Sequence, residues 1–242
     1  MKIVAIIQAR MTSTRFPGKV LKTIAGKPML WYVVNRVRTA KKIGDVVVAT
    51  STDPSDDFIE DYCKSNKIKY FRGDLDNVLK RYYETAKKFN ADAIVRITSD
   101  CPLIDGKLID EGIKEFMRSD CDYLSNTVKR TFPRGFDFEI FTFDALNAAF
   151  KNATKEPERE HVTPYIWRNH PEDFKIKYFK REIDKSHFRI TVDTPEDFEL
   201  VKILVEKYRT DIKSADDIIE ILDDHPEISQ LNAHIEQKHY GQ

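Results

Sequence analysis

The first half of the chain alternates short apolar runs with amphipathic segments, and this alternation constrains the fold more than any other feature. Apolar, β-branched runs predict strands at residues 2–8, 45–50, 68–72 and 92–98. The segments between them carry helical spacing, at 28–42, 55–66 and 77–90. Strands that alternate with helices predict a parallel sheet with helices packed on its faces. We therefore expect a Rossmann-like α/β fold with a mostly parallel central sheet and helices on both faces.

The pattern becomes less regular after Asp100. A helix is expected at 107–118 and a strand near 121–126. Aromatic residues alternate with polar ones at 136–143 and 174–179, which predicts antiparallel strands with one exposed face. Helical patterns at 144–153 and 159–169 separate them, so residues of about 130–182 are expected to form a small antiparallel insertion. A core-like strand at 187–192, a helix at 195–208 and a helical C-terminal extension at 213–242 complete the expected order.

Composition limits the classes of partner. The 242 residues suffice for one α/β domain with a small extension, and 41% hydrophobic residues suffice for its core. A formal net charge of +0 gives no overall attraction to nucleic acid or to an anionic membrane. No apolar stretch approaches the roughly 20 residues that span a bilayer. We expect a cytoplasmic protein that neither binds nucleic acid nor inserts into a membrane, with Cys63, Cys101 and Cys121 as reduced thiols.

Cations and hydroxyls are concentrated in the loop that follows the first strand. Arg10, Arg15 and Lys19 can offset several negative charges, Ser13 offers a hydroxyl donor, and Gly18 permits close backbone approach. Open α/β sheets bind ligands beyond the carboxyl ends of their strands. The loop therefore predicts a site for a polyphosphate, although a solvated basic loop is the simpler alternative.

Two common phosphate-binding motifs are absent. A Walker loop needs a glycine where Ser13 stands and a hydroxyl residue where Val20 follows the lysine. The chain also lacks the G-x-G-x-x-G pattern of dinucleotide-binding proteins. Hydride transfer to or from a nicotinamide is therefore disfavoured.

Two aspartates follow predicted strands directly, Asp100 after 92–98 and Asp193 after 187–192. If both strands belong to one sheet, the two carboxylates converge beside the basic loop. Two carboxylates with phosphate oxygens and water are a suitable ligand shell for Mg²⁺. Simpler alternatives are a helix cap for Asp193 and a turn residue for Asp100. Cys101 has no evident base partner, which disfavours a thiol nucleophile.

These segments together resemble a known family. The run A-R-x-x-S-T-R-x-P-G-K at 9–19, Gly26-Lys27-Pro28-Met29, Asp100-Cys101-Pro102-Leu103 and Asp193-Thr194-Pro195-Glu196-Asp197 look like the cytidylyltransferases that make CMP-activated acidic sugars. The branch that acts in spore-coat polysaccharide biosynthesis is the most similar, and the ketodeoxyoctulosonate and acylneuraminate enzymes are relatives. The resemblance covers about residues 1–208.

The resemblance implies a nucleotide-diphospho-sugar transferase fold and transfer of CMP from CTP to a sugar acid, with release of pyrophosphate. It implies a Mg²⁺ cofactor held by Asp100 and Asp193, and together with the order of expected elements it makes residues 1–212 the nucleotidyltransferase domain. The implied catalytic residues are Arg10, Arg15 and Lys19. The implied nucleotide-binding set is Ala9, Arg10, Ser13, Arg15, Lys19, Arg72, Gly73, Val78 and Asp100. The implied acceptor-binding residues are Arg134, Glu139 and His161, although His161 could be a structural histidine and Glu139 a polar strand residue.

Several alternatives share parts of this pattern. A nucleotidyltransferase could use another nucleoside triphosphate or a phosphorylated acceptor, although the glycine-rich opening of sugar-1-phosphate enzymes is missing. A metal-dependent glycosyltransferase could use 74–76 or 120–122, both of the form Asp-x-Asp. A catalytically silent nucleotide-binding protein would retain the fold. A homodimer is a further expectation, from the aromatic strands and from the resemblance.

Overall fold

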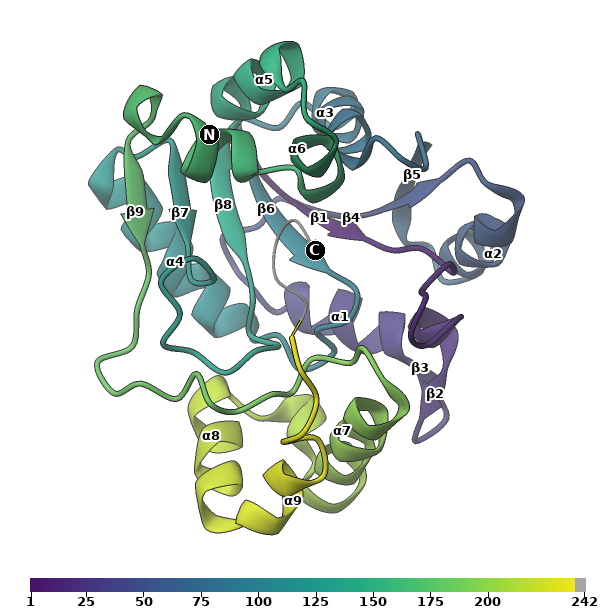
Figure 1. Cartoon of the computed structure of the whole chain (residues 1–242). Coiled ribbons are helices and arrows are strands. Elements are labelled where there is room, and N and C mark those ends of the chain that lie inside the picture. The colour runs from purple at the N-terminus through teal and green to yellow at the C-terminus, as the bar shows by residue number, and fades with distance from the viewer. Residues whose placement is uncertain (238–242) are drawn as a thin grey trace.

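A seven-stranded sheet forms the centre of the protein (Figure 1). The structure is a computed structural model that describes residues 1–237. The strand order is β5 (Lys69–Gly73), β4 (Asp45–Ser51), β1 (Ile3–Gln8), β6 (Ala93–Thr98), β8 (Glu139–Thr142), β7 (Tyr123–Ser125) and β9 (Ile176–Tyr178). Only β8 runs antiparallel to its neighbours. The expected mostly parallel α/β sheet is confirmed.

Helices cover both faces of this sheet. One face packs against α1 (Met29–Val37), α2 (Asp57–Ser65) and α4 (Gly106–Ser119), and the other against α3 (Val78–Lys88) and α5 (Phe143–Asn152). Side chains alternate between the two apolar clusters along β1, so Ala5 and Ile7 join one cluster and Val4 and Ile6 join the other. Because both faces are buried, β1 has a continuous apolar sequence.

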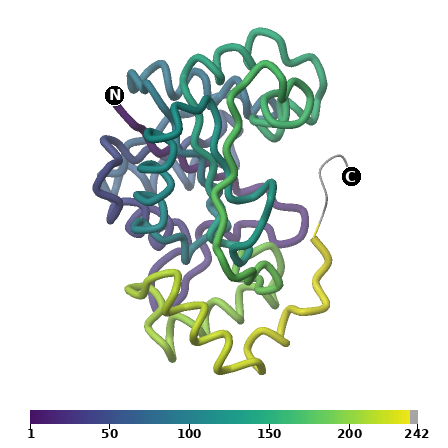
Figure 2. The backbone as a smooth tube through the Cα atoms, turned by 90° about the vertical axis from the view of Figure 1, so that its left-hand side faces the viewer, coloured from purple at the N-terminus to yellow at the C-terminus, as the bar shows by residue number. Residues whose placement is uncertain are grey.

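The C-terminal helices gather at the end of the molecule that faces the carboxyl ends of the parallel strands (Figures 1 and 2). They are α7 (Pro195–Tyr208), α8 (Ala215–Asp224) and α9 (Pro226–Gln230). Leu200 and Ile218 belong to the same apolar cluster as β1. The buried Arg36 of α1 also donates to the backbone oxygens of Thr210, Asp211 and Lys213. Of the expected extension at 213–242, residues 238–242 lie outside the described residues.

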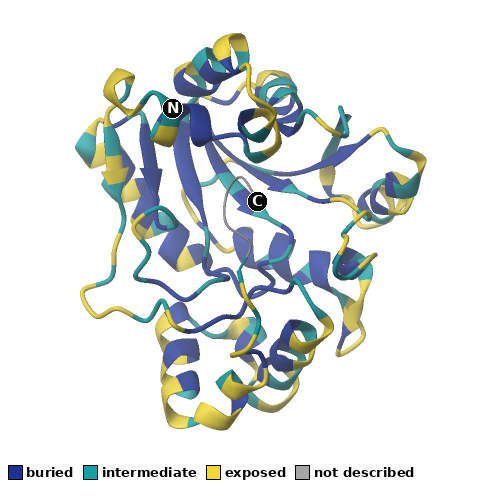
Figure 3. Cartoon of the chain, in the orientation of Figure 1, coloured by how far each residue is buried: buried dark blue, intermediate teal, exposed yellow. Residues whose placement is uncertain are grey.

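The strands expected at 136–143 and 174–179 agree with the prediction only in part: β8 pairs antiparallel with both neighbours as expected, but it is largely buried. β8 lies inside the main sheet between β6 and β7, and three of its four residues are buried (Figure 3). Its other face is therefore not exposed, because helices cover both sides of the sheet at this point. β9 pairs parallel with β7 rather than antiparallel. The antiparallel pair that does lie outside the main sheet is β2 (Thr23–Ile24) with β3 (Lys27–Pro28).

The helix expected at 159–169 is divided. α6 (Glu156–His161) is capped at its C-terminal end by Val162, which has a φ of 71°. A π-helical turn follows at Tyr165–Asn169. Pro164 between them has no amide hydrogen to continue the helix. The division turns the chain back over the α3 side of the sheet, where Val162 and Ile166 are buried.

The prediction of a strand at 187–192 is also wrong. The segment forms only an isolated β-bridge, between Arg134 and Arg189, within the described residues. It runs extended past Gly135, where an added Cβ would lie 2.7 Å from the Ile190 backbone carbon. Ile190 N donates to Arg134 O at 2.7 Å, and Val192 N donates to Asp100 O at 2.8 Å. The segment therefore hydrogen-bonds to loops beyond the sheet edge and carries the residues after Val192 to the end of β6.

None of the helices in the described part of the chain combines the length and the apolar character needed to cross a bilayer.

Candidate active site

Hydrogen bonds at its start and at its end hold the loop after β1 in place. Ala9 N donates to Ala49 O at 3.1 Å, and Met11 N donates to the buried carboxylate of Asp56 at 2.7 Å. Gly18 N donates to Met11 O at 2.9 Å with a φ of 68°, in the left-handed region that favours glycine. The loop therefore closes at Gly18 and directs Lys19 toward the carboxyl edge of the sheet.

Lys19 lies between the two aspartates that the sequence singled out. Its side chain is 10% exposed, and its Nζ donates to Asp193 Oδ1 at 2.9 Å and to Val192 O at 2.7 Å. The same nitrogen is 3.5 Å from Asp100 Oδ2. The structure thus joins the opening loop, the end of β6 and the segment before α7 at one point.

Three cations surround the Asp193 carboxylate. Lys19 contacts Oδ1, while Arg15 and Arg189 each place a guanidinium nitrogen 3.0 Å from Oδ2. Burial alone would raise the pKa of Asp193, but the charges of Lys19, Arg15 and Arg189 hold that pKa below its ordinary value. Burial alone would lower the pKa of Lys19, but Asp100 and Asp193 raise it above its ordinary value. Both groups are therefore charged at neutral pH.

Asp193 is not the cap of α7. The capping residue is Thr194, whose hydroxyl accepts the backbone N–H of Asp197. The Asp193 oxygens are instead directed at the basic side chains, so the capping alternative does not explain this residue.

Asp100 is partly accessible, with a side chain that is 27% exposed. Thr98 Oγ1 donates to its carboxylate, and Cys101 Sγ lies 3.5 Å from the same oxygen. Burial and the Asp100 charge raise the pKa of the Cys101 thiol well above its ordinary value, which disfavours a thiolate nucleophile.

The carboxylates of Asp100 and Asp193 form a donor set that fits a divalent cation. They flank a position that the Lys19 ammonium group occupies, and carboxylate oxygens are the ligands that Mg²⁺ prefers. Phosphate oxygens of a bound nucleotide could both complete such a ligand shell and attract Lys19 away from it.

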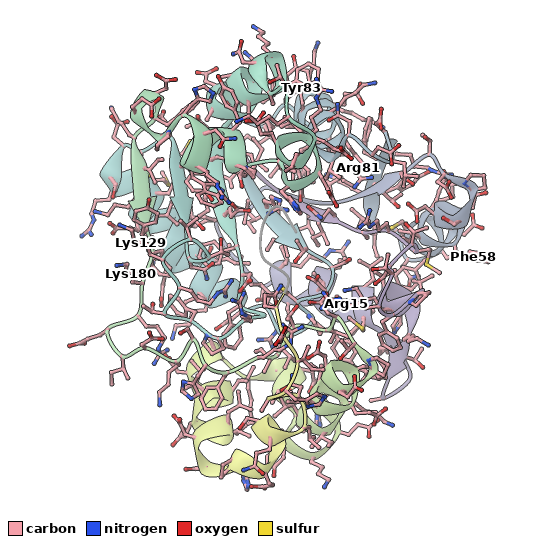
Figure 4. All side chains as sticks on the ribbon, in the orientation of Figure 1. Arg15, Phe58, Arg81, Tyr83, Lys129 and Lys180 are labelled. Carbon is pink, nitrogen blue, oxygen red and sulfur yellow. The ribbon has the colours of Figure 1, made fainter. Side chains whose placement is uncertain are left out.

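Two further residues of the loop lie beside this cluster. Arg10 is exposed and has no hydrogen-bond or ion-pair partner within residues 1–237. Ser13 Oγ accepts a long hydrogen bond, 3.4 Å, from Phe16 N. Both side chains are therefore available to a ligand, as is Arg15, which is 29% exposed (Figure 4).

The residues expected near the base are mostly engaged. Arg72 donates to Ser51 O at 2.7 Å and Asp53 O at 2.9 Å, and it pairs with Glu60 at 2.6 Å. Its guanidinium therefore holds the loop between β4 and α2, and any contact with a nucleotide stays a prediction. Gly73 is packed tightly, because an added Cβ would lie 3.0 Å from the side chains of Phe71 and Arg81. Val78 is buried at the start of α3.

Sequence reasoning missed Arg81, which is 1% exposed on the apolar face of α3. Its Nη1 donates to Asp74 O at 3.1 Å, and its buried Nε has no hydrogen-bond partner among residues 1–237. In the view of Figure 4, Arg81 lies above Arg15. The available signal was a basic residue at helical spacing among Val78, Tyr82 and Thr85.

The residues expected near an acceptor fall into two groups. Glu139 is buried, accepts hydrogen bonds from Tyr123 and Thr163, and pairs with Arg96. His161 lies nearby at the end of α6, where burial, together with the Arg96 charge, lowers its pKa despite the opposing charge of Glu160. Glu139 thus lies in a buried network beneath His161.

Arg134 lies on the opposite side of the site, close to Asp193. It lines a pocket of about 270 Å³ together with Arg189, His187, Asn232 and Gln237. Burial and the charges of Arg130 and Arg189 lower the pKa of Arg134. The structure therefore separates Arg134 from Glu139 and His161 rather than joining all three in one contact.

The fold and the clustered charges define a class of protein. A mostly parallel α/β sheet with a cation-rich loop and two aspartates at its carboxyl edge is the arrangement of a nucleotidyltransferase. The chain belongs to the cytidylyltransferase family, whose sequence model matches residues 4–240. It is therefore a CTP-dependent nucleotidyltransferase.

Similar proteins span nearly the whole chain. The spore coat polysaccharide biosynthesis protein SpsF of Bacillus subtilis is 34% identical over 93% of this chain and 95% of its own length. A 3-deoxy-manno-octulosonate cytidylyltransferase of Geobacter sulfurreducens is 28% identical over 83% of this chain and 98% of its own. The solved structure of a cytidylyltransferase from Leptospira borgpetersenii has a TM-score of 0.91 at 37% identity, covering 99% of this chain and 100% of that one.

Proposed function

We propose that this protein transfers CMP from CTP to a hydroxyl of a sugar acid and releases pyrophosphate, in the synthesis of a surface polysaccharide or glycan. The observation that carries the proposal is the position of Lys19 between Asp100 and Asp193, with Arg15 on the same carboxylate. The sugar-acid acceptor and the polysaccharide role rest on the names of the similar proteins described above.

The reaction needs charge stabilisation more than covalent chemistry. The acceptor oxygen attacks the α-phosphorus, the bond between that phosphorus and the oxygen bridging to the β-phosphate breaks, and the hydroxyl proton passes to water. Negative charge then grows on pyrophosphate, and preorganised cations stabilise it. Arg10, Arg15 and Lys19 are the cations that the loop supplies for this purpose.

Charge exchange links nucleotide binding to the carboxylates. A triphosphate would compete with Asp193 for Arg15 and Lys19, because phosphate oxygens form strong charge-assisted hydrogen bonds. If these contacts move to the nucleotide, Asp100 and Asp193 could hold Mg²⁺, while Arg189 stays in contact with Asp193. When bound, the metal would supply further stabilisation of the phosphate charge.

We place the proposed acceptor contacts on the His161 side of the site. His161 is partly exposed above the buried Glu139, Arg96 and Thr163 network. Glu139 accepts hydrogen bonds from Tyr123 and Thr163 and pairs with Arg96, so it is suited to hold these neighbouring side chains in place. A homodimer is part of the proposal, and β9, which lies at the end of the sheet, has an edge that a second copy could use.

A pyrophosphate-release assay tests the proposal. CTP, UTP, ATP and GTP are each combined with a panel of eight-carbon and nine-carbon sugar acids, with and without Mg²⁺. Metal-dependent release with CTP and one sugar acid is expected, and the CMP-sugar is identified by mass spectrometry. Release with sugar 1-phosphates only, or donor-sugar transfer without pyrophosphate, would contradict it.

A further inference from the structure

Asp197 in the first turn of α7 is the centre of a buried hydrogen-bond network. It is 0% exposed and accepts Arg189 Nε and Nη2, each at 2.8 Å. It also accepts the backbone N–H groups of Asp193 at 2.8 Å and Thr194 at 3.1 Å. A buried carboxylate with this many donors fixes the backbone that carries Asp193.

The C-terminal extension completes this network. Asn232, which is 2% exposed, donates from Nδ2 to Asp197 Oδ1 at 2.7 Å and to Arg189 O at 3.1 Å. Gln237 Oε1 accepts Arg189 Nη1 at 2.5 Å. Figures 1 and 2 show the segment after α9 leaving the helices and rising along the open side of the molecule. Residues at 232–237 thus contact an arginine that itself contacts Asp193.

Arg189 differs from the other two cations on Asp193. Its guanidinium is held on one side by Asp197 and on another by Gln237, and its Nη2 is 3.0 Å from Asp193 Oδ2. Arg15 and Lys19 belong to the opening loop and are the cations that a triphosphate would attract. When they turn to the nucleotide, Arg189 remains as the contact that orients the Asp193 carboxylate.

We propose that Arg189, Asn232 and Gln237 are positioning residues that hold the Asp193 carboxylate in the orientation needed to bind the divalent cation with CTP. The C-terminal extension is therefore part of the active site rather than a peripheral addition. This inference rests on the proposed role of Asp193 as a metal ligand.

Metal titrations of single variants test the inference. Mn²⁺ is titrated, with water-proton relaxation as the signal, into protein saturated with a CTP analogue whose α–β bridging oxygen is a methylene group. We expect the half-saturating Mn²⁺ concentration to rise about tenfold in Asn232→Ala, and about threefold in Gln237→Ala, which removes one partner of Arg189. Affinity for CTP in EDTA should not change, because the loop cations are intact.

Matched variants separate positioning from folding. Gln237→Glu retains an oxygen acceptor for Arg189 and should restore the wild-type Mn²⁺ response. Gln230→Ala removes an exposed glutamine of the same segment that makes no hydrogen bond to Arg189, and it should behave as wild type. If Asn232→Ala unfolds, Gln237→Ala still tests the inference, because the Gln237 side chain is partly exposed and can be removed without opening the core.

Two results would overturn the inference. One is an unchanged Mn²⁺ response in folded Gln237→Ala. The other is a loss of CTP affinity in EDTA as large as the loss of Mn²⁺ affinity, which would make the segment a wall of the nucleotide site. The titration uses no acceptor, so failure to find pyrophosphate release with any sugar acid would refute the proposed function without altering this result.

Discussion

Replacing Lys19 with methionine removes one charge from the centre of the candidate site. The methionine retains most of the aliphatic stem, so packing around the buried chain is largely preserved. The loss is therefore confined to the ammonium group and its contacts with Val192 O, Asp193 and Asp100.

The effect on stability should be modest. Hydrogen bonds to charged groups contribute about 1.5–3 kcal/mol each, but the variant no longer buries an ammonium ion, and Asp193 keeps Arg15 and Arg189. We expect the free energy of unfolding to fall by about 1–3 kcal/mol. The effect on rate should be larger, because removal of one preorganised donor to a developing charge costs about 100-fold to 1000-fold in kcat.

Urea unfolding and pyrophosphate release measure the two quantities on the same preparation. Lys22→Met is the matched control, since Lys22 is an exposed lysine three residues away that lies over the Phe16 ring. A folded Lys19→Met protein with wild-type kcat at saturating CTP and acceptor would refute the assignment of Lys19 to the leaving group.

Other outcomes follow from the same contacts. Asp100→Asn should raise the Mg²⁺ concentration for half-maximal turnover, and an unchanged Mg²⁺ titration would remove Asp100 from the metal site. Because Asp193 has a lowered pKa in the folded protein, its stabilisation is complete well above its ordinary value of 3.8 and declines as pH falls below that value. Acid titration of unfolding should therefore show a smaller decline for Asp193→Asn, and equal slopes would contradict this. Glu139→Gln should destabilise the fold by about 3–5 kcal/mol, because it leaves the partly buried Arg96 without its charge partner. The exposed control Glu199→Gln should change urea stability by less than about 0.5 kcal/mol, and equal effects would refute the network.

Local patterns were sufficient for the first half of the fold. The strands expected at 2–8, 45–50, 68–72 and 92–98 agree with β1, β4, β5 and β6 to within about one residue at most ends. Continuous β-branched runs predict buried strands correctly, because a strand that is buried on both faces of the sheet needs an apolar side chain at every position.

The second half was harder because its strands depend on distant partners. β8 and β9 alternate aromatic and polar residues as half-exposed strands do, yet β8 is buried between β6 and β7. A buried polar residue in that alternation is Glu139, whose burial depends on Arg96, Tyr123 and Thr163. The alternation of aromatic and polar residues in β8 therefore reflects a buried hydrogen-bond network rather than a solvent-exposed face of the strand.

The sequence by itself determined the parallel sheet, the cation-rich loop and the two aspartates after apolar segments. Each of these features depends on a few consecutive residues and can be recognised from them. Only the tertiary structure decided that Lys19 lies between those aspartates, that Arg72 is engaged by the loop after β4, and that the C-terminal extension reaches Arg189. These contacts join segments far apart in the chain. They depend on how helices and strands pack against one another, and no local pattern of residues encodes that packing.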